Sequence, residues 1–218
     1  RNVRIDAGWA LRAVVDTNTL AGRDLLAHMQ YNTDQPSGAL QIGVFCLDRG
    51  EVAEARRHFS RALAWDTNSA PIHHAMAVAL SMEGKPNEAV ASLRVACRLA
   101  PGDPEYQYKL GLALNECGKM TEAMSALEQA VKIEPRYARA WYNLGLAYNA
   151  SGRSDEAVDT LLRAEALDGV SAQIPYARAT ILARLGRVRE ARAAAQRALE
   201  LQPGYPEALG LLAALPGS

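Results

Sequence analysis

The sequence predicts an all-α fold, a solenoid of five helix-turn-helix repeats, because four residue columns recur at an interval of 34 in one register. The glycine column is Gly50, Gly84, Gly118, Gly152 and Gly186. The first alanine column is Ala55, Ala89, Ala123, Ala157 and Ala191. The second alanine column is Ala62, Ala96, Ala130, Ala164 and Ala198. The glutamate column is Glu54, Glu88, Glu122, Glu156 and Glu190.

Each column has a physical reason within a pair of antiparallel helices. The glycine follows an apolar-periodic helix and supplies the left-handed conformation that ends it. The glutamate falls in the first turn of the next helix, where the helix dipole favours a negative charge. The two alanines of each repeat lie on one helix face, where a larger side chain would push neighbouring helices apart.

The ends of the second helices are predicted from polar residues and prolines. The residues expected to cap their N-termini are Asn87, Thr121, and Ser154 or Asp155. The prolines expected to end these helices are Pro101, Pro135 and Pro203. Each repeat is therefore expected to contain two helices with short connections.

The fourth repeat carries the motif of a known family. Residues 140–148 read Ala-Trp-Tyr-Asn-Leu-Gly-Leu-Ala-Tyr, and the segment 108–114 is similar. With the glycine and alanine columns, this pattern resembles the signature of the tetratricopeptide repeat (TPR). The resemblance implies a right-handed superhelix whose first helices line a concave face, and a role in holding other proteins. The five repeats are expected at 36–69, 70–103, 104–137, 138–171 and 172–205.

The C-terminal end of the array departs from the family pattern. In the fifth repeat, Pro175 stands at the usual tryptophan place and Arg178 at a usual apolar place. The first helix of that repeat is therefore expected to start late or to pack loosely. Residues 206–218 form half a repeat and resemble the capping helix that shields the last face of a solenoid.

The N-terminal lead, residues 1–35, is less regular. Residues 3–11 resemble the second helix of a HEAT repeat, and residues 20–31 are expected to form another helix. A lone HEAT helix cannot bury its own face, so it either packs on the first TPR or belongs to HEAT repeats of a longer chain. The order of HEAT then TPR more weakly resembles the C-terminal region of large bacterial multihaem cytochrome c proteins, although these residues contain no haem motif.

Charge and hydropathy argue against several classes of partner. The 218 residues include 24 lysines plus arginines and 24 aspartates plus glutamates, and zero net charge argues against a broad nucleic-acid surface. No apolar run approaches the roughly 18 residues of a membrane span, so no membrane insertion is expected. The chain begins without methionine or a signal-peptide stretch and is expected to be mature or part of something longer. A cytoplasmic and a periplasmic location both fit.

Aromatic and polar side chains recur on the face that the resemblance assigns to the groove. Tyrosine offers a flat apolar face and a hydroxyl, an asparagine amide can satisfy a peptide N–H and C=O together, and lysine or arginine can grip a carboxylate. The predicted peptide-binding residues are Tyr108, Lys109, Asn115, Arg139, Tyr142, Asn143, Asn149 and Tyr176. The three tyrosines, 34 residues apart, form a ladder. A second interpretation is architectural, with the tyrosines packing between adjacent first helices.

Two specialised uses of TPR grooves fit this sequence less well. The clamp that some TPR domains use for chaperone C-termini is matched by Asn143, but Leu112 and Ala177 occupy other clamp places. The asparagine ladder of sugar-transferring enzymes would need more than the single rung Asn143.

No catalytic, metal or cofactor site is predicted. The neighbours His73 and His74 would point about 100° apart on a helix, so they would not converge on a metal. No phosphate-binding loop, nucleophile elbow or zinc-protease motif occurs. Cys46, Cys97 and Cys117 match no haem or zinc motif and are expected to be small buried apolar residues.

Arginines crowd the last repeat. They are Arg178, Arg184, Arg187, Arg189, Arg192 and Arg197. Because Glu190 and Glu200 lie between them, the cluster is interpreted as a solvated face, with contact to an acidic partner as the alternative.

The sequence therefore predicts a non-catalytic scaffold that binds a polypeptide segment in a concave groove. One alternative is a structural module of a larger complex or chain, which uses helix edges and the convex face and docks residues 1–35 on neighbouring repeats or subunits. Another is a regulatory arm of an enzyme or electron-transfer protein whose chemistry lies outside this chain.

Overall fold

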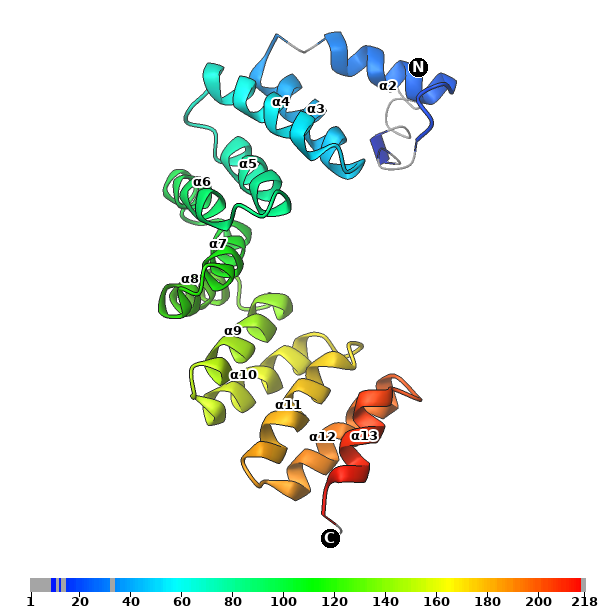
Figure 1. Cartoon of the computed structure of the whole chain (residues 1–218), viewed down its shortest axis with the longest axis vertical. Helices are drawn as coiled ribbons and strands as arrows, with labels where there is room; N and C mark the ends of the chain where they lie inside the picture. Colours follow the sequence, from blue (N-terminus) through cyan, green and yellow to red (C-terminus); the bar gives the residue numbers. More distant parts are fainter. Residues whose placement is uncertain (1–8, 11, 13–14, 32–33, 217–218) are drawn as a thin grey trace. The chain divides into compact units, whose positions relative to one another are not determined.

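The computed structural model describes residues 9–10, 12, 15–31 and 34–216. The chain forms two compact units, Arg1–Gly102 and Asp103–Ser218, and each is described by itself. All regular elements in the described ranges are helices, as predicted (Figure 1). Unit 1 contains α2 (Leu20–Tyr31), α3 (Pro36–Asp48), α4 (Val52–Trp65), α5 (Ala70–Met82) and α6 (Pro86–Leu99). Unit 2 contains α7 (Pro104–Glu116), α8 (Met120–Ile133), α9 (Ala138–Ala150), α10 (Ser154–Leu167), α11 (Gln173–Arg184), α12 (Val188–Leu201) and α13 (Pro206–Ala214).

The helices form antiparallel pairs because glycine ends the first helix of each pair in a left-handed conformation. Gly118 has a φ of 71°, and the amide of Lys119 then donates to the carbonyl of Leu114 at 2.9 Å. All five glycines of the predicted column have positive φ, which confirms their predicted role.

The predicted N-caps of the second helices are wrong. α8 begins at Met120, so Thr121 lies inside the helix, and the N-cap Lys119 makes no side-chain capping bond. Asn87 likewise lies inside α6, and Ser154 and Asp155 lie inside α10. The physical reason is the short link: glycine and one further residue reverse the chain, so the next helix begins before a polar cap is reached. The helix ends two residues before Pro101, Pro135 and Pro203, as expected from the prolines.

Small residues set the distance between paired helices. Every alanine of the two predicted columns is fully buried, which confirms that these columns mark close helix contacts. Gly145 on α9 serves the same purpose, because a Cβ there would lie 2.8 Å from Cγ of Leu161 on α10. The repeat signature therefore records where backbones approach each other.

In unit 1, the N-terminal lead packs on the first helix pair. α2 spans the residues predicted for it, and its Leu25 and Met29 form a buried cluster with Phe45 of α3. Trp9 packs against this cluster, and Arg12 pairs with Asp48 at 2.5 Å. The rest of the HEAT-like segment 3–11 lies mostly outside the described residues.

In unit 2, the fifth repeat packs more tightly than the sequence suggested. α11 starts at Gln173, one residue later than the 34-residue interval from Ala138 would place it. The expected late start is confirmed, and the alternative of loose packing is wrong, because Pro175, Ile181 and Leu182 are fully buried. After α12, the short helix α13 buries Ala208 against a cluster that contains Ala172 and Ala198.

Candidate functional site

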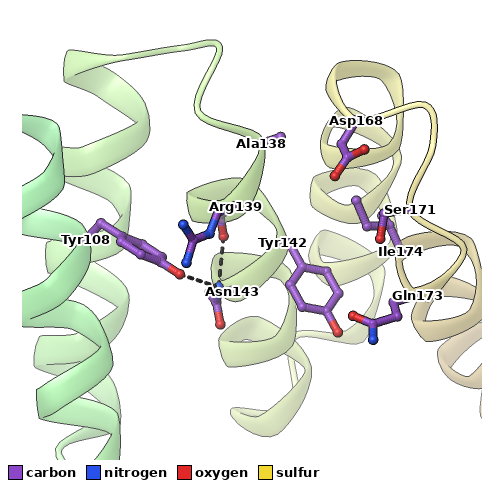
Figure 2. Close-up of a pocket in the computed structure, with 9 residues that line it drawn as sticks. All are labelled: Tyr108, Ala138, Arg139, Tyr142, Asn143, Asp168, Ser171, Gln173 and Ile174. Carbon is purple, nitrogen blue, oxygen red and sulfur yellow. Dashed lines mark hydrogen bonds between the residues drawn. The ribbon is translucent and has the colours of Figure 1, made fainter. Parts of the chain in front are cut away.

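A pocket of about 280 Å³ lies between α9 and α11 in unit 2 (Figure 2). One side is formed by the beginning of α9, and the other by the connection from α10 to α11 and the first turn of α11. Its lining residues are Tyr108, Ala138, Arg139, Tyr142, Asn143, Asp168, Ser171, Gln173 and Ile174. The pocket therefore combines two tyrosines, two side-chain amides, a guanidinium and a carboxylate.

Asn143 stands at the centre of this surface. Its Nδ2 donates to the carbonyl oxygen of Arg139 at 2.9 Å and to the hydroxyl oxygen of Tyr108 at 3.3 Å. Because the carbonyl of Arg139 can only accept, it fixes which end of the side-chain amide faces the helix. Figure 2 shows the Asn143 oxygen pointing away from both bonds. That oxygen is oriented to accept a hydrogen bond from outside the helix.

A second pocket, of about 200 Å³, lies between α7 and α9. Asn143 lines this pocket too, opposite Asn115, and the half-buried Leu112 and Leu146 give it an apolar wall. Asn143 therefore separates an apolar pocket from a more polar one.

Tyr108 is a core residue whose hydroxyl accepts a hydrogen bond from Asn143 at the pocket. Its side chain is 3 % exposed and belongs to the cluster that α7, α8 and α9 share. Its ring centre lies 5.0 Å from that of Tyr137, with the two planes tilted by 53°. The architectural interpretation of the tyrosine ladder thus applies to Tyr108.

Charged groups surround the Tyr108–Tyr137 pair. The Tyr137 hydroxyl donates to the carboxylate of Glu105, and burial together with this carboxylate raises the pKa of Tyr137. Nζ of Lys109 lies 3.5 Å from Oε1 of Glu105, so the ammonium group partly neutralises the charge of this carboxylate. Arg139 is exposed and its guanidinium carbon lies 5.5 Å from the Tyr108 ring centre. Arg139 belongs to none of the ion pairs among the described residues.

The other two tyrosines of the ladder differ from each other. The Tyr176 ring packs edge-on against the ring of Tyr205, with 5.2 Å between their centres. Tyr142 is half-buried and lines the pocket between α9 and α11, and burial raises its pKa. Of the three, Tyr142 presents its ring to a cavity.

Asn149 lies at the far end of α9 and is engaged within the chain. Its Oδ1 accepts from the guanidinium of Arg184 at 2.9 Å and from the hydroxyl of Ser154 at 3.5 Å. Five of the predicted residues line pockets: Asn115, Arg139, Tyr142, Asn143 and Tyr108, the last two also hydrogen-bonded to each other. The other three, Lys109, Asn149 and Tyr176, have partners within the chain and line neither pocket.

Among the pocket residues that sequence reasoning missed are two polar ones in the connection after α10, Asp168 and Ser171. Asp168 ends α10, and its Oδ1 accepts from the amide of Val170 at 3.3 Å. Ser171 stands 34 residues after Tyr137 and 34 before Tyr205. Comparing residues at the 34-residue interval could have identified Ser171, because it is a serine between two tyrosines in this column.

The arginine cluster of the last repeat is occupied largely by internal contacts. Arg178 donates twice to Oε2 of Glu165, at 2.9 and 3.1 Å, and both side chains are largely buried. Arg187 pairs with Glu190, Arg197 with Glu200, and Arg192 donates to the carbonyl of Pro216. These contacts support the interpretation as a structural and solvated face.

The part of the chain that the structure describes holds no group of three or more histidine, cysteine, aspartate or glutamate side chains suited to a metal ion. Cys46 and Cys97 are buried as expected, while Cys117 is half-buried at the end of α7. None of the described helices has the length and apolar character needed to cross a membrane.

Family models for tetratricopeptide repeats match four stretches of the sequence. Those described as "Tetratricopeptide repeat" match residues 47–112, 138–170 and 176–215, and one described as "TPR repeat" matches 112–152. No curated protein sequence matches the chain.

Solved structures of TPR proteins resemble the fold. Residues 41 to the end of MamA from Desulfovibrio magneticus RS-1 match with a TM-score of 0.73 and 24% identity, over 79% of this chain and 98% of that one. YrrB, described as a TPR protein with an unusual peptide-binding site, matches with a TM-score of 0.72 and 19% identity, over 85% and 95%. PilF of Pseudomonas aeruginosa matches with a TM-score of 0.71 and 22% identity, over 84% and 82%.

Proposed function

Because the chain belongs to the tetratricopeptide-repeat family, we propose that it is a protein-interaction scaffold whose unit 2 binds an extended polypeptide segment along α7, α9 and α11. The observation that carries the proposal is the side-chain amide of Asn143. Its nitrogen is held by Arg139 and Tyr108, and its oxygen is left to accept a peptide N–H between two pockets.

The two pockets give such a segment places for its side chains. Neighbouring packed helices lie about 8–10 Å apart, and an extended chain rises about 3.3 Å per residue, so side chains about three residues apart could enter successive pockets. The α7–α9 pocket, walled by Leu112 and Leu146, suits an apolar side chain. Arg139 at the α9–α11 pocket suits an acceptor group.

A role without catalysis belongs to the same proposal. The side chains of the site are amides, aromatic rings and an arginine, which recognise a polypeptide by hydrogen bonds and packing. YrrB shares this fold and is described as having a peptide-binding site, which supports peptide binding as the use of the groove.

The test is selection from a phage-displayed library of random 12-residue peptides, with the full chain as bait. Peptides that the wild-type chain enriches should bind the Asn143→Ala variant about tenfold more weakly, because a buried peptide N–H loses its acceptor. Gln129→Ala is the matched control, since Gln129 is an exposed amide on α8 that lines neither pocket. If the wild-type chain enriches no peptide, or if the two variants bind alike, the groove is not the binding site.

A further inference from the structure

The pocket between α9 and α11 occupies the place where two equivalent junctions of unit 2 hold a tyrosine ring. In the first, the Tyr137 ring, from the α8–α9 connection, packs on Tyr108 of α7 with 5.0 Å between centres. In the second, the Tyr205 ring packs on Tyr176 of α11 with 5.2 Å between centres. In both pairs the second tyrosine follows the first by 29 residues.

At the junction between these two, the first tyrosine of the pair is present and the second is replaced. Tyr142 is the equivalent of Tyr108 and Tyr176, and the residue 29 positions later is Ser171. Both Tyr142 and Ser171 line the pocket, as Figure 2 shows. A serine side chain cannot cover a tyrosine ring, which accounts for the open space of about 280 Å³ in front of Tyr142.

The size and the lining of the space suit one aromatic side chain. At about 280 Å³ the space lies near the lower end of the range for ligand pockets and has room for a large side chain. Aromatic rings prefer tilted or edge-on contacts with centres about 4.5–7 Å apart, the arrangement that the two filled junctions show.

The residue at the position of Glu105 also changes at this junction. At the first junction the Tyr137 hydroxyl donates to Glu105, and the residue equivalent to Glu105 is Arg139. Arg139 lines the pocket and can only donate hydrogen bonds. It would therefore serve a ring that carries an acceptor oxygen.

We infer that this pocket binds a tyrosine side chain of the partner polypeptide, stacked on Tyr142 in the place that Tyr137 and Tyr205 fill at the other two junctions. The ring would come from the bound segment, so this site depends on the proposed function. Tyr142 supplies the stacking face and Arg139 a donor to the phenol oxygen.

The test uses N-acetyl-L-tyrosinamide, titrated into the full chain and followed by NMR chemical shifts of the amides of residues 139–143 and 171–173. We expect saturable shifts with a dissociation constant on the order of millimolar, because one side chain makes few contacts. N-acetyl-L-leucinamide should bind about three- to tenfold more weakly, because it lacks the aromatic pair.

Two variants locate the binding. Ser171→Tyr supplies the missing ring from the chain itself and should abolish the shifts. Tyr142→Leu keeps an apolar side chain but removes the stacking face, and should weaken binding about three- to tenfold. Ser125→Tyr, which places a new ring on the exposed face of α8, should leave binding unchanged.

The results separate this inference from peptide binding as such. Equal affinity for the tyrosine and leucine amides, or unchanged binding in both Ser171→Tyr and Tyr142→Leu, would overturn the tyrosine site even if the chain enriches peptides through Asn143. If the chain enriches no peptide at all, the proposed function fails and the tyrosine site fails with it.

Discussion

Two equivalent helix junctions are packed with different kinds of side chain. One lies between α8 and α9, and the other lies between α10 and α11. At the first, Val131 and Leu144 lie in one buried apolar cluster. At the second, the equivalent residues are Glu165 and Arg178, which form an ion pair at 2.9 Å. The fold therefore tolerates an exchange of an apolar pair for a charged pair when both members change.

The same two junctions differ in a second column. Tyr137 covers Tyr108 at the first junction, whereas Ser171 leaves Tyr142 uncovered at the second. The first junction has a buried apolar pair and a stacked tyrosine, and the second has an ion pair and a pocket. At the second junction the departures leave a pocket, while the directional ion pair between Glu165 and Arg178 still links the helices.

The largest effect is expected at the apolar junction. Leu144→Ala should lower the free energy of unfolding by about 3 kcal/mol, because Leu144 is 2 % exposed and its truncation leaves a cavity. Urea unfolding followed by circular dichroism measures the change.

Leu162→Ala is the control for this substitution, since Leu162 on α10 is 52 % exposed and should cost no more than about 0.5 kcal/mol. Equal losses in the two variants would show that Leu144 does not hold the junction.

An intermediate effect is expected at the charged junction. Arg178→Ala should lower the free energy of unfolding by about 2 kcal/mol, because it leaves Glu165 buried with only the more distant Arg197, at 3.8 Å. Replacing the pair by Glu165→Val with Arg178→Leu restores the apolar chemistry of the first junction and should recover at least the wild-type value.

The same unfolding experiment on Glu165→Val, on Arg178→Leu and on the double variant gives the coupling between these residues. A double variant as unstable as Arg178→Ala would mean that the α10–α11 junction cannot adopt the apolar packing, and the comparison between the junctions would fail.

These two junctions also show which features the sequence could predict. The glycine and alanine columns predicted the helix pairs, because each reports a local requirement: a positive φ at Gly118, or a close approach such as that of Gly145 to Leu161. Arg178 stands at a usually apolar position, which predicted a late start or loose packing of α11. Its partner Glu165 lies in a different column, so the pairing that keeps α11 packed depends on how α10 meets α11 and could not be predicted.

The candidate site was predictable in part for a similar reason. Tyr142 and Asn143 follow from the repeat position, and both line the pocket. Ser171 does not, because a serine in a connection carries no chemical signal of its own. Ser171 stands out only by comparison with Tyr137 and Tyr205 at the equivalent positions, and the stacking of those two rings is seen only in the folded chain.

The smallest effect tests whether the open junction is shaped for a ring. Ser171→Tyr should raise the free energy of unfolding by about 1 kcal/mol, since a stacked aromatic pair contributes roughly 0.5–1.5 kcal/mol beyond the area it buries. In a chain of this length that gain corresponds to a midpoint about 3 °C higher in a thermal melt. Ser125→Tyr on the exposed face of α8 should leave the midpoint within about 1 °C, because an unpacked surface ring contributes little. A lower midpoint for Ser171→Tyr would mean that the space in front of Tyr142 cannot hold a ring as the other two junctions do. The junction between α10 and α11 would then be a less well packed version of the junction between α8 and α9. The packing of Tyr137 and Tyr205 would no longer support a tyrosine ligand for its pocket.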